Sequence, residues 1–424
     1  MKKVLIITYY WPPKGGVGVQ RWLKLTKYLY KYNYKPIIYT PENGTTPLSD
    51  KSLLDSVPLE LKVLKNRIFE PQALFPFLGK RSPDSDVLIK KNNSFLNKFL
   101  IWFRANFFIP DSRCLWIKPS IKFLLKYLKT NPVDIIISTG PPHSMHMIAL
   151  SLKKKLNIKW IADFRDPWTD IEYFDHLPLL SLVRKKHQIL EKEVLSHVDL
   201  ALSVSPSWAH NISMLGAKKV EVLTNGYDPD DYCFESSNDD REKFRIGHFG
   251  LYNELRDHSF FWKTIQKICL DNLMFAHSLS FLFAGEVHGQ FFPNLKNFQL
   301  DKKTDYYKYL KHHESIEKMM QCDLLLVTQG HTKSVKGRLP AKFFEYLGSR
   351  KPILAIGKKN SDLEQIISQV SYAWFVDFEN DKLLYDTILH IYELSKKDNK
   401  FHDDISEFSR EYHAKKIIQL INTL

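Results

Sequence analysis

The stretch from Val4 to Gly18, VLIITYYWPPKGGVG, decides how the first half of the chain folds. It opens with a short, continuous apolar run, which is typical of a parallel strand covered on both faces. A loop containing Gly15 and Gly16 follows, and a helical pattern begins near Gln20. The stretch therefore predicts a strand, a glycine loop and a helix. Backbone N–H groups at such a loop bind anions, so we expect the glycines to approach a phosphate; a tight turn without a ligand is the alternative.

The same alternation of apolar runs and helical patterns continues along the chain and then restarts in its second half. This order is typical of doubly wound parallel sheets, so the sequence predicts two Rossmann-like α/β domains. The expected strands are 4–8, 36–40, 134–139, 160–162, 200–205, 244–249, 280–284, 323–328 and 352–356. The expected helices include 21–30, 144–156, 182–195, 259–270 and 315–321.

The length of 424 residues suits two domains, each able to bury its own core. Turn-forming residues over 224–229, followed by polar residues to about 240, predict the hinge. We expect one Rossmann-like domain over 1–225, a second over 226–404, and a last helix over 405–424 that packs back on the first domain. Two domains also imply a cleft between them.

Composition limits the function and the compartment. The net charge of +14 indicates a polyanionic partner such as nucleic acid, anionic lipid or a phosphorylated small molecule. The N-terminus lacks the long apolar stretch of a signal peptide, and no run approaches the length of a membrane-spanning helix. The four cysteines are too scattered for a metal or redox motif, which favours a reducing, cytoplasmic compartment.

Two loops in the first half leave the carboxyl ends of expected strands, where ligands bind in open parallel sheets. One contains His143, which we expect to reach a substrate, whereas His146 lies in the following helix and is better explained by packing. The other, ADFRDPW over 162–168, crowds charges that are costly to fold unless they pair or contact a ligand. It supplies Arg165 and Asp166 as candidates. An Arg165 ion pair that only shapes the loop is the alternative.

The second half has two comparable segments. Gly250 follows an expected strand, and Arg256 a few residues later is suited to hold a diphosphate through two hydrogen bonds. Pro340 begins a helix that brings Lys342 close to its N-terminus and Glu345 onto the same face. Lys342 is suited to phosphate and Glu345 to ribose hydroxyls. A solvated arginine and an ordinary Lys-Glu helix pair are the alternatives.

These segments resemble glycosyltransferase family 4, the retaining enzymes with the GT-B fold of two Rossmann-like domains facing across a cleft. The resemblance rests on the Gly15-Gly16 loop, on 225–228, on 323–327, and above all on 340–347 followed by 351–352. It implies that Lys342 and Arg256 neutralise the diphosphate of a nucleotide-sugar donor while Glu345 binds the ribose. It also implies retention of configuration, no metal and no cofactor beyond the donor.

The chain departs from the family pattern at two positions. Gly337 replaces a second glutamate, and Arg165 stands where the family usually carries a histidine. A subgroup with the Phe-Arg-Asp-Pro-Trp motif explains both departures, with Asp166, Arg165 and His143 as catalytic candidates. The resemblance favours a transferase of bacterial surface-polysaccharide synthesis with a lipid-linked saccharide acceptor. A catalytically silent homologue that binds a nucleotide sugar or a membrane partner is the alternative, and an epimerase is disfavoured.

Residues 90–129 combine basic and aromatic side chains, with Asp111 as the single acid. Such a segment can lie among anionic headgroups, so we expect peripheral contact with the inner face of a membrane. Packing of the aromatics in the core is the alternative, and nucleic-acid binding is disfavoured because no RNA-binding motif is present. The segment contains Lys90, Lys91, Phe95, Lys98, Phe99, Trp102, Phe103, Arg104, Phe107, Phe108, Arg113, Trp116, Lys118, Lys122, Phe123, Lys126, Tyr127 and Lys129.

Overall fold

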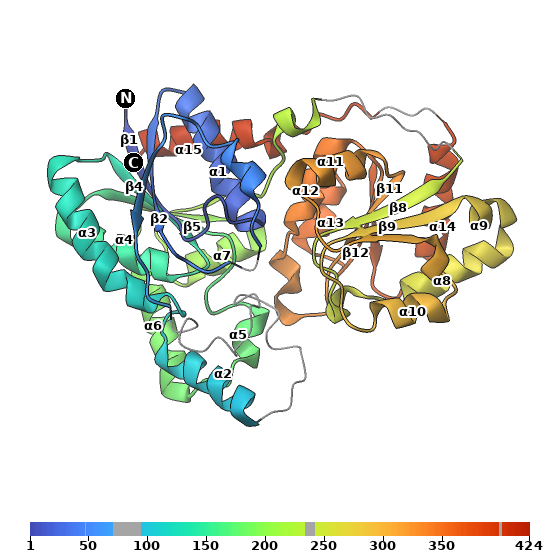
Figure 1. Cartoon of the computed structure of the whole chain (residues 1–424), viewed down its shortest axis with the longest axis horizontal. Helices are drawn as coiled ribbons and strands as arrows, with labels where there is room; N and C mark the ends of the chain where they lie inside the picture. Colours follow the sequence, from blue (N-terminus) through green and yellow to red (C-terminus); the bar gives the residue numbers. More distant parts are fainter. Residues whose placement is uncertain (47, 71–94, 234–241, 398–400) are drawn as a thin grey trace. The chain divides into compact units, whose positions relative to one another are not determined.

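The computed structural model describes residues 1–46, 48–70, 95–233, 242–397 and 401–424. The chain divides into two compact units (Figure 1). Unit 1 contains Met1–Thr224 and His413–Leu424, and unit 2 contains Asn225–Tyr412. Each unit has one parallel sheet with helices on both of its faces, as the sequence predicts.

Unit 1 has a seven-stranded sheet in the order β3-β2-β1-β4-β5-β6-β7. Two of its strands, β3 and β7, were not expected from the sequence, because they are short and only partly buried. The strands are β1 (Lys3–Ile7), β2 (Lys35–Pro41), β3 (Lys62–Asn66), β4 (Ile135–Gly140), β5 (Lys159–Phe164), β6 (Leu200–Ser203) and β7 (Val220–Val222). The helices are α1 (Val17–Lys31), α2 (Phe95–Phe107), α3 (Ile117–Thr130), α4 (Ser144–Leu156), α5 (Glu172–His176), α6 (Ser181–His197) and α7 (Pro206–Met214).

Unit 2 repeats this arrangement with a six-stranded sheet in the order β10-β9-β8-β11-β12-β13. In both sheets the order reverses beside the first strand, which is where doubly wound sheets bind ligands. The strands are β8 (Phe244–Phe249), β9 (Leu279–Ala284), β10 (Thr304–Tyr307), β11 (Leu324–Thr328), β12 (Ile353–Gly357) and β13 (Ala373–Asp377). The helices are α8 (Ser259–Asp271), α9 (Leu273–Ser278), α10 (Phe291–Asn297), α11 (His312–Met320), α12 (Ala341–Ser349), α13 (Asp362–Ile367) and α14 (Asp381–Ser395).

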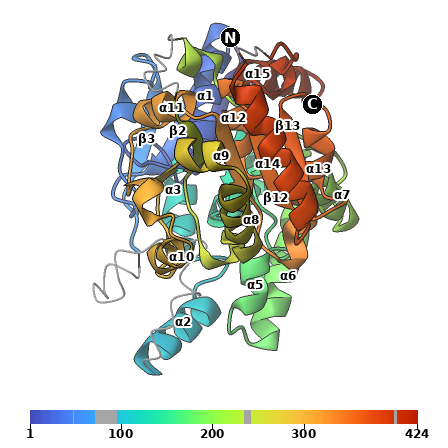
Figure 2. The ribbon, with the colours of Figure 1, turned by 90° about the vertical axis from the view of Figure 1, so that its right-hand side faces the viewer.

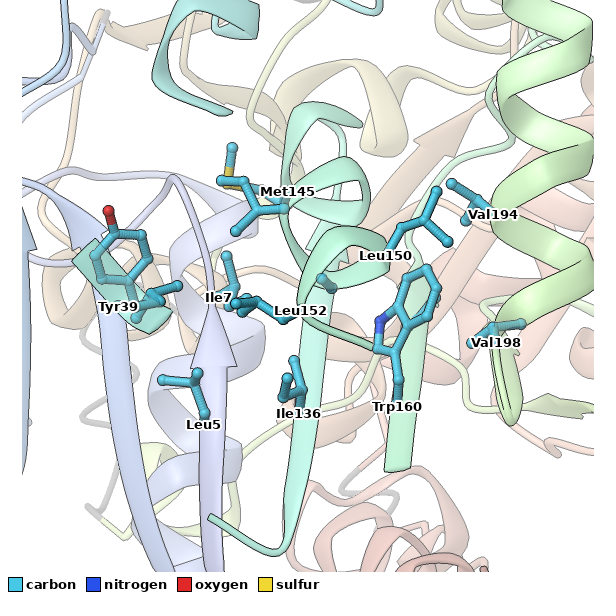
Figure 3. Close-up of a cluster of buried hydrophobic side chains, with 14 of the residues drawn as sticks. Leu5, Ile7, Tyr39, Ile136, Met145, Leu150, Leu152, Trp160, Val194 and Val198 are labelled. Carbon is cyan, nitrogen blue, oxygen red and sulfur yellow. The ribbon is translucent and has the colours of Figure 1, made fainter. Parts of the chain in front are cut away.

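Apolar side chains fill both faces of the unit 1 sheet. On one face, strand residues such as Leu5 and Ile136 pack against α3, α4 and α6, with Trp160 fully buried (Figure 3). On the other face lies α1, with Trp22 at its centre. Full burial of one such side chain contributes about 1.5–3 kcal/mol, so these clusters hold the strand ends firmly in place.

The last helix begins later than the sequence predicts. Residues 406–408 form a separate 3₁₀ turn, and α15 spans Arg410–Asn422. Ile405 and Phe408 belong to a core cluster of unit 2, so that unit extends to Tyr412 rather than to residue 404. From His413 onward the helix belongs to unit 1, where it packs beside α1 (Figures 1 and 2). Its core contacts are made by Ala414, Ile417, Leu420 and Ile421.

A buried ion pair joins α1 to the strand ends of unit 1. The Asp163 carboxylate at the end of β5 accepts hydrogen bonds from Arg21 Nη2 at 2.9 Å and Nε at 3.1 Å. It also accepts from Trp22 Nε1 at 2.7 Å and Thr139 Oγ1 at 2.9 Å, and neither charged side chain is exposed. The cation that hydrogen-bonds to Asp163 is therefore Arg21 of α1, and the neighbouring Arg165 adds a smaller electrostatic contribution.

Candidate functional site

The loop after β8 and the start of α12 bring Gly250, Arg256 and Lys342 together. Gly250 turns the chain with φ of 89°, and a Cβ there would lie 3.7 Å from Lys342 Nζ. Pro340 is the N-cap of α12, so Lys342 lies in the first helical turn, where the helix end favours anions. Burial lowers the pKa of Lys342 well below its usual value, and the positive charge of nearby Arg256 lowers it further.

His248, in the penultimate position of β8, completes this basic cluster. Its Nε2 lies 2.7 Å from Lys342 Nζ, and the side chain is buried. Burial holds the pKa of His248 well below its usual value, with Lys342 and Arg256 adding to the effect, so the imidazole is neutral. Our sequence interpretation missed this residue because β8 otherwise follows the pattern of a core strand. A histidine two positions before the glycine turn is the signal that was available.

Glu345 lies one turn further along α12, in a polar environment of its own. Burial raises its pKa above the usual value, and the positive charges of His312 and Arg410 offset only part of this effect. Within the described residues Lys342 hydrogen-bonds to His248, and its interaction with Glu345 is electrostatic without a direct ion pair. Tyr232 holds this part of the helix by donating a 2.5 Å hydrogen bond to the Glu345 carbonyl oxygen.

Asp257 fixes the loop that carries Arg256. Its carboxylate is buried and accepts hydrogen bonds from four side chains. Although burial by itself raises its pKa, the hydrogen bonds lower it below the usual value, so the group stays ionised. The donors are His288 Nε2 at 2.8 Å, Asn294 Nδ2 at 2.9 Å, Trp262 Nε1 at 2.5 Å and the Tyr252 hydroxyl at 3.2 Å. The adjacent Arg256 is thereby held close to Lys342.

Gly285 supports the Gly250 turn from the neighbouring strand, and its replacement tests how rigid the site must be. It has φ of 125°, and a Cβ would lie 2.5 Å from the Gly250 carbonyl oxygen. We expect Gly285→Ala to destabilise the protein by about 1–3 kcal/mol in denaturant unfolding, because strain of that order accompanies such backbone conformations. Gly289→Ala is the matched control, since its Cβ would meet nothing within 4 Å. Equal effects of the two substitutions would contradict this account.

In unit 1 the carboxyl ends of β1, β4 and β5 gather the other predicted residues. Arg165 Nη2 donates to the Pro141 carbonyl oxygen, and its guanidinium lies 5.7 Å from the centre of the Tyr10 ring. Gly16 has φ of 98° at the N-cap of α1, where a Cβ would meet nothing. Gly15 donates its N–H to Leu48 at 3.0 Å, so this amide stabilises the turn and is already occupied.

His143 lies within a buried aromatic cluster next to these loops. Its ring stacks on Trp168 with centroids 4.8 Å apart and an interplanar angle of 3°. Neither ring nitrogen has a hydrogen-bond partner among the described residues, and burial lowers its pKa well below the usual value. His146 Nδ1 lies 2.8 Å from Ser138 Oγ, in keeping with a packing role. Asp166, in the loop that follows β5, is partly exposed.

The described residues show no group of three or more His, Cys, Asp or Glu side chains placed to hold a metal ion. Likewise, none of the helices in the described ranges is both long and apolar enough to cross a membrane.

Two doubly wound sheets in one chain, each with polar residues at its strand ends, define the GT-B class of fold. The chain belongs to glycosyltransferase family 4, because the sequence model of this family matches residues 15–231. No curated protein matches the chain in sequence.

Several solved structures share the whole fold at low sequence identity. A sucrose-phosphate synthase from Thermosynechococcus elongatus matches with a TM-score of 0.67 and 10% identity, over 100% of this chain and 99% of that chain. A mutant of S. aureus TarM, in complex with fondaparinux, alpha-GlcNAc-glycerol and UDP, matches with a TM-score of 0.63 and 12% identity over 100% of both chains. A UDP-GlcNAc 2-epimerase from Methanocaldococcus jannaschii matches with a TM-score of 0.53 and 13% identity, also over 100% of both chains. These likenesses establish the fold.

Proposed function

We propose that the protein transfers a sugar, with retention of configuration, from a nucleoside-diphosphate donor to a saccharide acceptor. The observation that carries this proposal is the cluster of Lys342, His248 and Arg256. A buried ammonium whose hydrogen-bond partner is a neutral imidazole, with a guanidinium beside it, is suited to an added anion. The family relationship identifies a nucleotide sugar as the source of that anion, and the related TarM structure contains UDP.

In this proposal unit 2 binds the donor. Lys342 and Arg256 stabilise the charge that develops on the diphosphate as the glycosidic bond breaks, without a metal ion. Glu345 accepts hydrogen bonds from ribose hydroxyls, since an ionised carboxylate offers two acceptor oxygens. Gly250 lets the backbone turn close to Lys342, and Pro340 sets the start of the helix. A leaving phosphate oxygen then takes the proton of the acceptor hydroxyl.

The loops of unit 1 form the acceptor side in this proposal. Arg165 and Asp166 directly follow β5, and they are our candidates for contact with the reacting sugar. Gly16 contributes the exposed N-terminus of α1. His143 is neutral and acts by shaping the loop surface or by accepting a hydrogen bond.

Release of nucleoside diphosphate tests this function. The protein is incubated with UDP-, GDP-, ADP- and dTDP-sugars, with and without lipid-linked saccharide acceptors, and both the released nucleotide and the anomeric product are measured. Acceptor-dependent release with an α-linked product from an α-donor supports the proposal. Binding without release would favour a silent homologue, for which Gly337 and Arg165 are the specific observations. Inversion at a sugar carbon of the donor would indicate an epimerase.

We also propose that unit 1 docks on an anionic membrane, through α2 rather than through all of 90–129. Lys90 and Lys91 lie outside the described residues. The α3 half of the segment packs into the core, where Trp116, Leu124 and Leu128 are buried. The helix α2 is more exposed: among its described side chains only Asn106 is buried, residues 100–105 are partly buried, and the others are exposed.

The exposed surface of α2 is aromatic and basic. Phe95 is 85% exposed, Phe107 62% and Phe99 49%, while Lys98 and Arg104 lie on the same helix. Asn106 ties the helix to the start of α6, because it donates to Pro178 at 2.9 Å and accepts from Leu180 at 2.8 Å. Figures 1 and 2 show α2 at the end of unit 1 that also carries α5. Exposed rings with basic neighbours suit a negatively charged headgroup layer, and this supports our proposal of docking at an inner membrane face beside a lipid-linked acceptor.

Replacing Phe95, Phe99 and Phe107 by serine is expected to abolish co-sedimentation with anionic vesicles at low salt. Each ring lost removes apolar area from the lipid contact, while fold stability changes little because the rings are exposed. The control replaces Leu270, Leu273 and Met274, which are 77%, 72% and 72% exposed in unit 2, by serine. Membrane docking through α2 is wrong if the wild-type protein stays in the supernatant, or if both triple variants bind equally.

A further inference from the structure

His248 has a geometry that a core residue does not need. The ring is buried between Tyr252, at a centroid distance of 4.8 Å, and Phe283, at 5.5 Å. Its Nε2 faces the Lys342 ammonium at 2.7 Å, and its Nδ1 has no hydrogen-bond partner among the described residues. A buried polar ring with one unpaired nitrogen is costly to fold, which favours a role for the ring in the site.

The short distance between the two nitrogens limits how many protons they carry. Two nitrogen atoms 2.7 Å apart can share one hydrogen, but they cannot both direct one at the other. The ionisable groups that face His248 are Lys342 on α12, Arg256 in the turn before α8, and Tyr252, whose hydroxyl donates to Asp257. Glu345 acts on Lys342 from the same helix. In the described part of the site, the charged groups that shift the pKa of His248 itself are the two cations Lys342 and Arg256, and no carboxylate is among them.

We propose that His248 is a positioning residue of the donor site, which holds the Lys342 ammonium by accepting its hydrogen bond and releases it to the diphosphate. This inference rests on the proposed donor site and extends it. When the ammonium turns to a phosphate oxygen, the lone pair of Nε2 is freed and takes a proton from the solvent. The imidazolium then faces the diphosphate as an added cation. Binding of a diphosphate is consequently coupled to the uptake of a proton.

Isothermal titration calorimetry with inorganic pyrophosphate tests the proposal, because pyrophosphate is the part common to all nucleoside-diphosphate donors. Titrations at pH 7 in two buffers of very different ionisation enthalpy report the protons exchanged. We expect the wild-type protein to take up a fraction of a proton approaching about one. His248→Gln keeps an acceptor for Lys342 but cannot be protonated, so binding persists with less uptake. His248→Leu removes the acceptor, so affinity falls roughly tenfold.

The outcomes separate this inference from the donor site itself. Wild-type binding that is lost in Lys342→Ala, but that involves no proton exchange between pH 6 and pH 8, overturns the role of His248 and leaves the donor site standing. Equal affinity and equal proton uptake in wild type, His248→Gln and His248→Leu overturns it as well. Absence of pyrophosphate binding by the wild type, or binding that Lys342→Ala leaves unchanged, contradicts the donor site and His248 together. If His248→Leu does not fold, the difference in proton uptake between the wild type and His248→Gln still tests the role of His248.

Discussion

Lys342→Ala is expected to lower kcat/KM for the nucleotide-sugar donor by about 10²–10³-fold, the loss typical of removing one preorganised donor that faces developing charge. Lys342 is the ammonium of the cluster, and its hydrogen bond to His248 aims it at the end of β8. Steady-state kinetics with the donor identified by nucleotide release provide the measurement. Lys263→Ala is the control, because Lys263 is an exposed lysine of α8. Unchanged kinetics in Lys342→Ala would contradict the assignment.

Replacing Lys342 by an uncharged side chain of similar length is expected to stabilise the free protein. Since the pKa of Lys342 is lowered on folding, the native state binds fewer protons than the unfolded state between the folded pKa and the unfolded pKa of about 10.4. The lysine thus destabilises the native state at neutral pH, and stability rises with pH between its folded and unfolded pKa values. Lys342→Met is expected to raise the unfolding midpoint without ligand at pH 7, by calorimetry, and to flatten its increase toward pH 10. A lower midpoint would show that Lys342 has a structural role.

Asp163→Ala is expected to produce the largest loss of stability. Removing one member of a buried ion pair costs about 3–5 kcal/mol, because the other charge is left buried. Here Arg21 would keep only its hydrogen bonds to the carbonyl oxygens of Leu223 at 2.9 Å and Thr224 at 2.6 Å. For a domain of this size the loss corresponds to a fall in the melting midpoint of about 2–4 °C per kcal/mol. Calorimetric melting checks this expectation.

The pH dependence of the same pair has a definite sign. Burial alone raises the pKa of Asp163, but Arg21 and the other donors lower it below its usual value. The contribution of Asp163 to stability is therefore present above its unfolded pKa of about 3.9 and is lost as the pH falls through the folded pKa. Asp166→Asn, on the same loop and partly exposed, is the control, and we expect it to leave the midpoint nearly unchanged while reducing turnover. If Asp163→Ala melts like Asp166→Asn, the buried pair does not anchor unit 1.

The sequence predicted the sheets well because buried parallel strands carry a local signal. The run 244–249 and the helix 144–156 were expected with the bounds that the structure shows for β8 and α4. The strands β3 and β10 were missed since their side chains are only partly buried and their apolar pattern is weak. The start of the last helix was misplaced because a 3₁₀ turn and a helix carry the same apolar spacing over 405–412.

Residues of the basic cluster in unit 2 could be predicted where they lie in a recognisable sequence motif. Gly250, Arg256 and Lys342 were named from the sequence, and the structure brings them together. His248 was not named, because its role depends on Lys342, which lies 94 positions away in the chain. A local sequence pattern does not reveal a contact between residues so far apart. Asp257 was missed for a similar reason. Its donors Trp262, Asn294 and His288 lie on α8, on α10 and in the loop before α10.

The basic and aromatic segment shows the limit of composition as a guide. The two halves of the segment 90–129 have a similar composition. In the structure, however, Leu124 and Leu128 of α3 are buried in the core, whereas Phe95 and Phe99 of α2 are exposed. The apolar residues of both helices have helical spacing, and the rings of α2 at 99, 102, 103 and 107 contact one another along one face. Tertiary packing, rather than residue type, decides which half is available to lipid.

The central claim, that unit 2 binds a nucleoside-diphosphate sugar, is tested most directly by thermal stabilisation across a panel of nucleoside diphosphates and their sugars. A ligand that binds only the native state raises the unfolding midpoint, by an amount equivalent to about 2.7 kcal/mol at a hundredfold excess over Kd. We predict that compounds of one base raise the midpoint of the wild type and that the shift is lost in Lys342→Ala and Glu345→Ala. No shift with any compound, or a shift that both variants retain, would contradict the account.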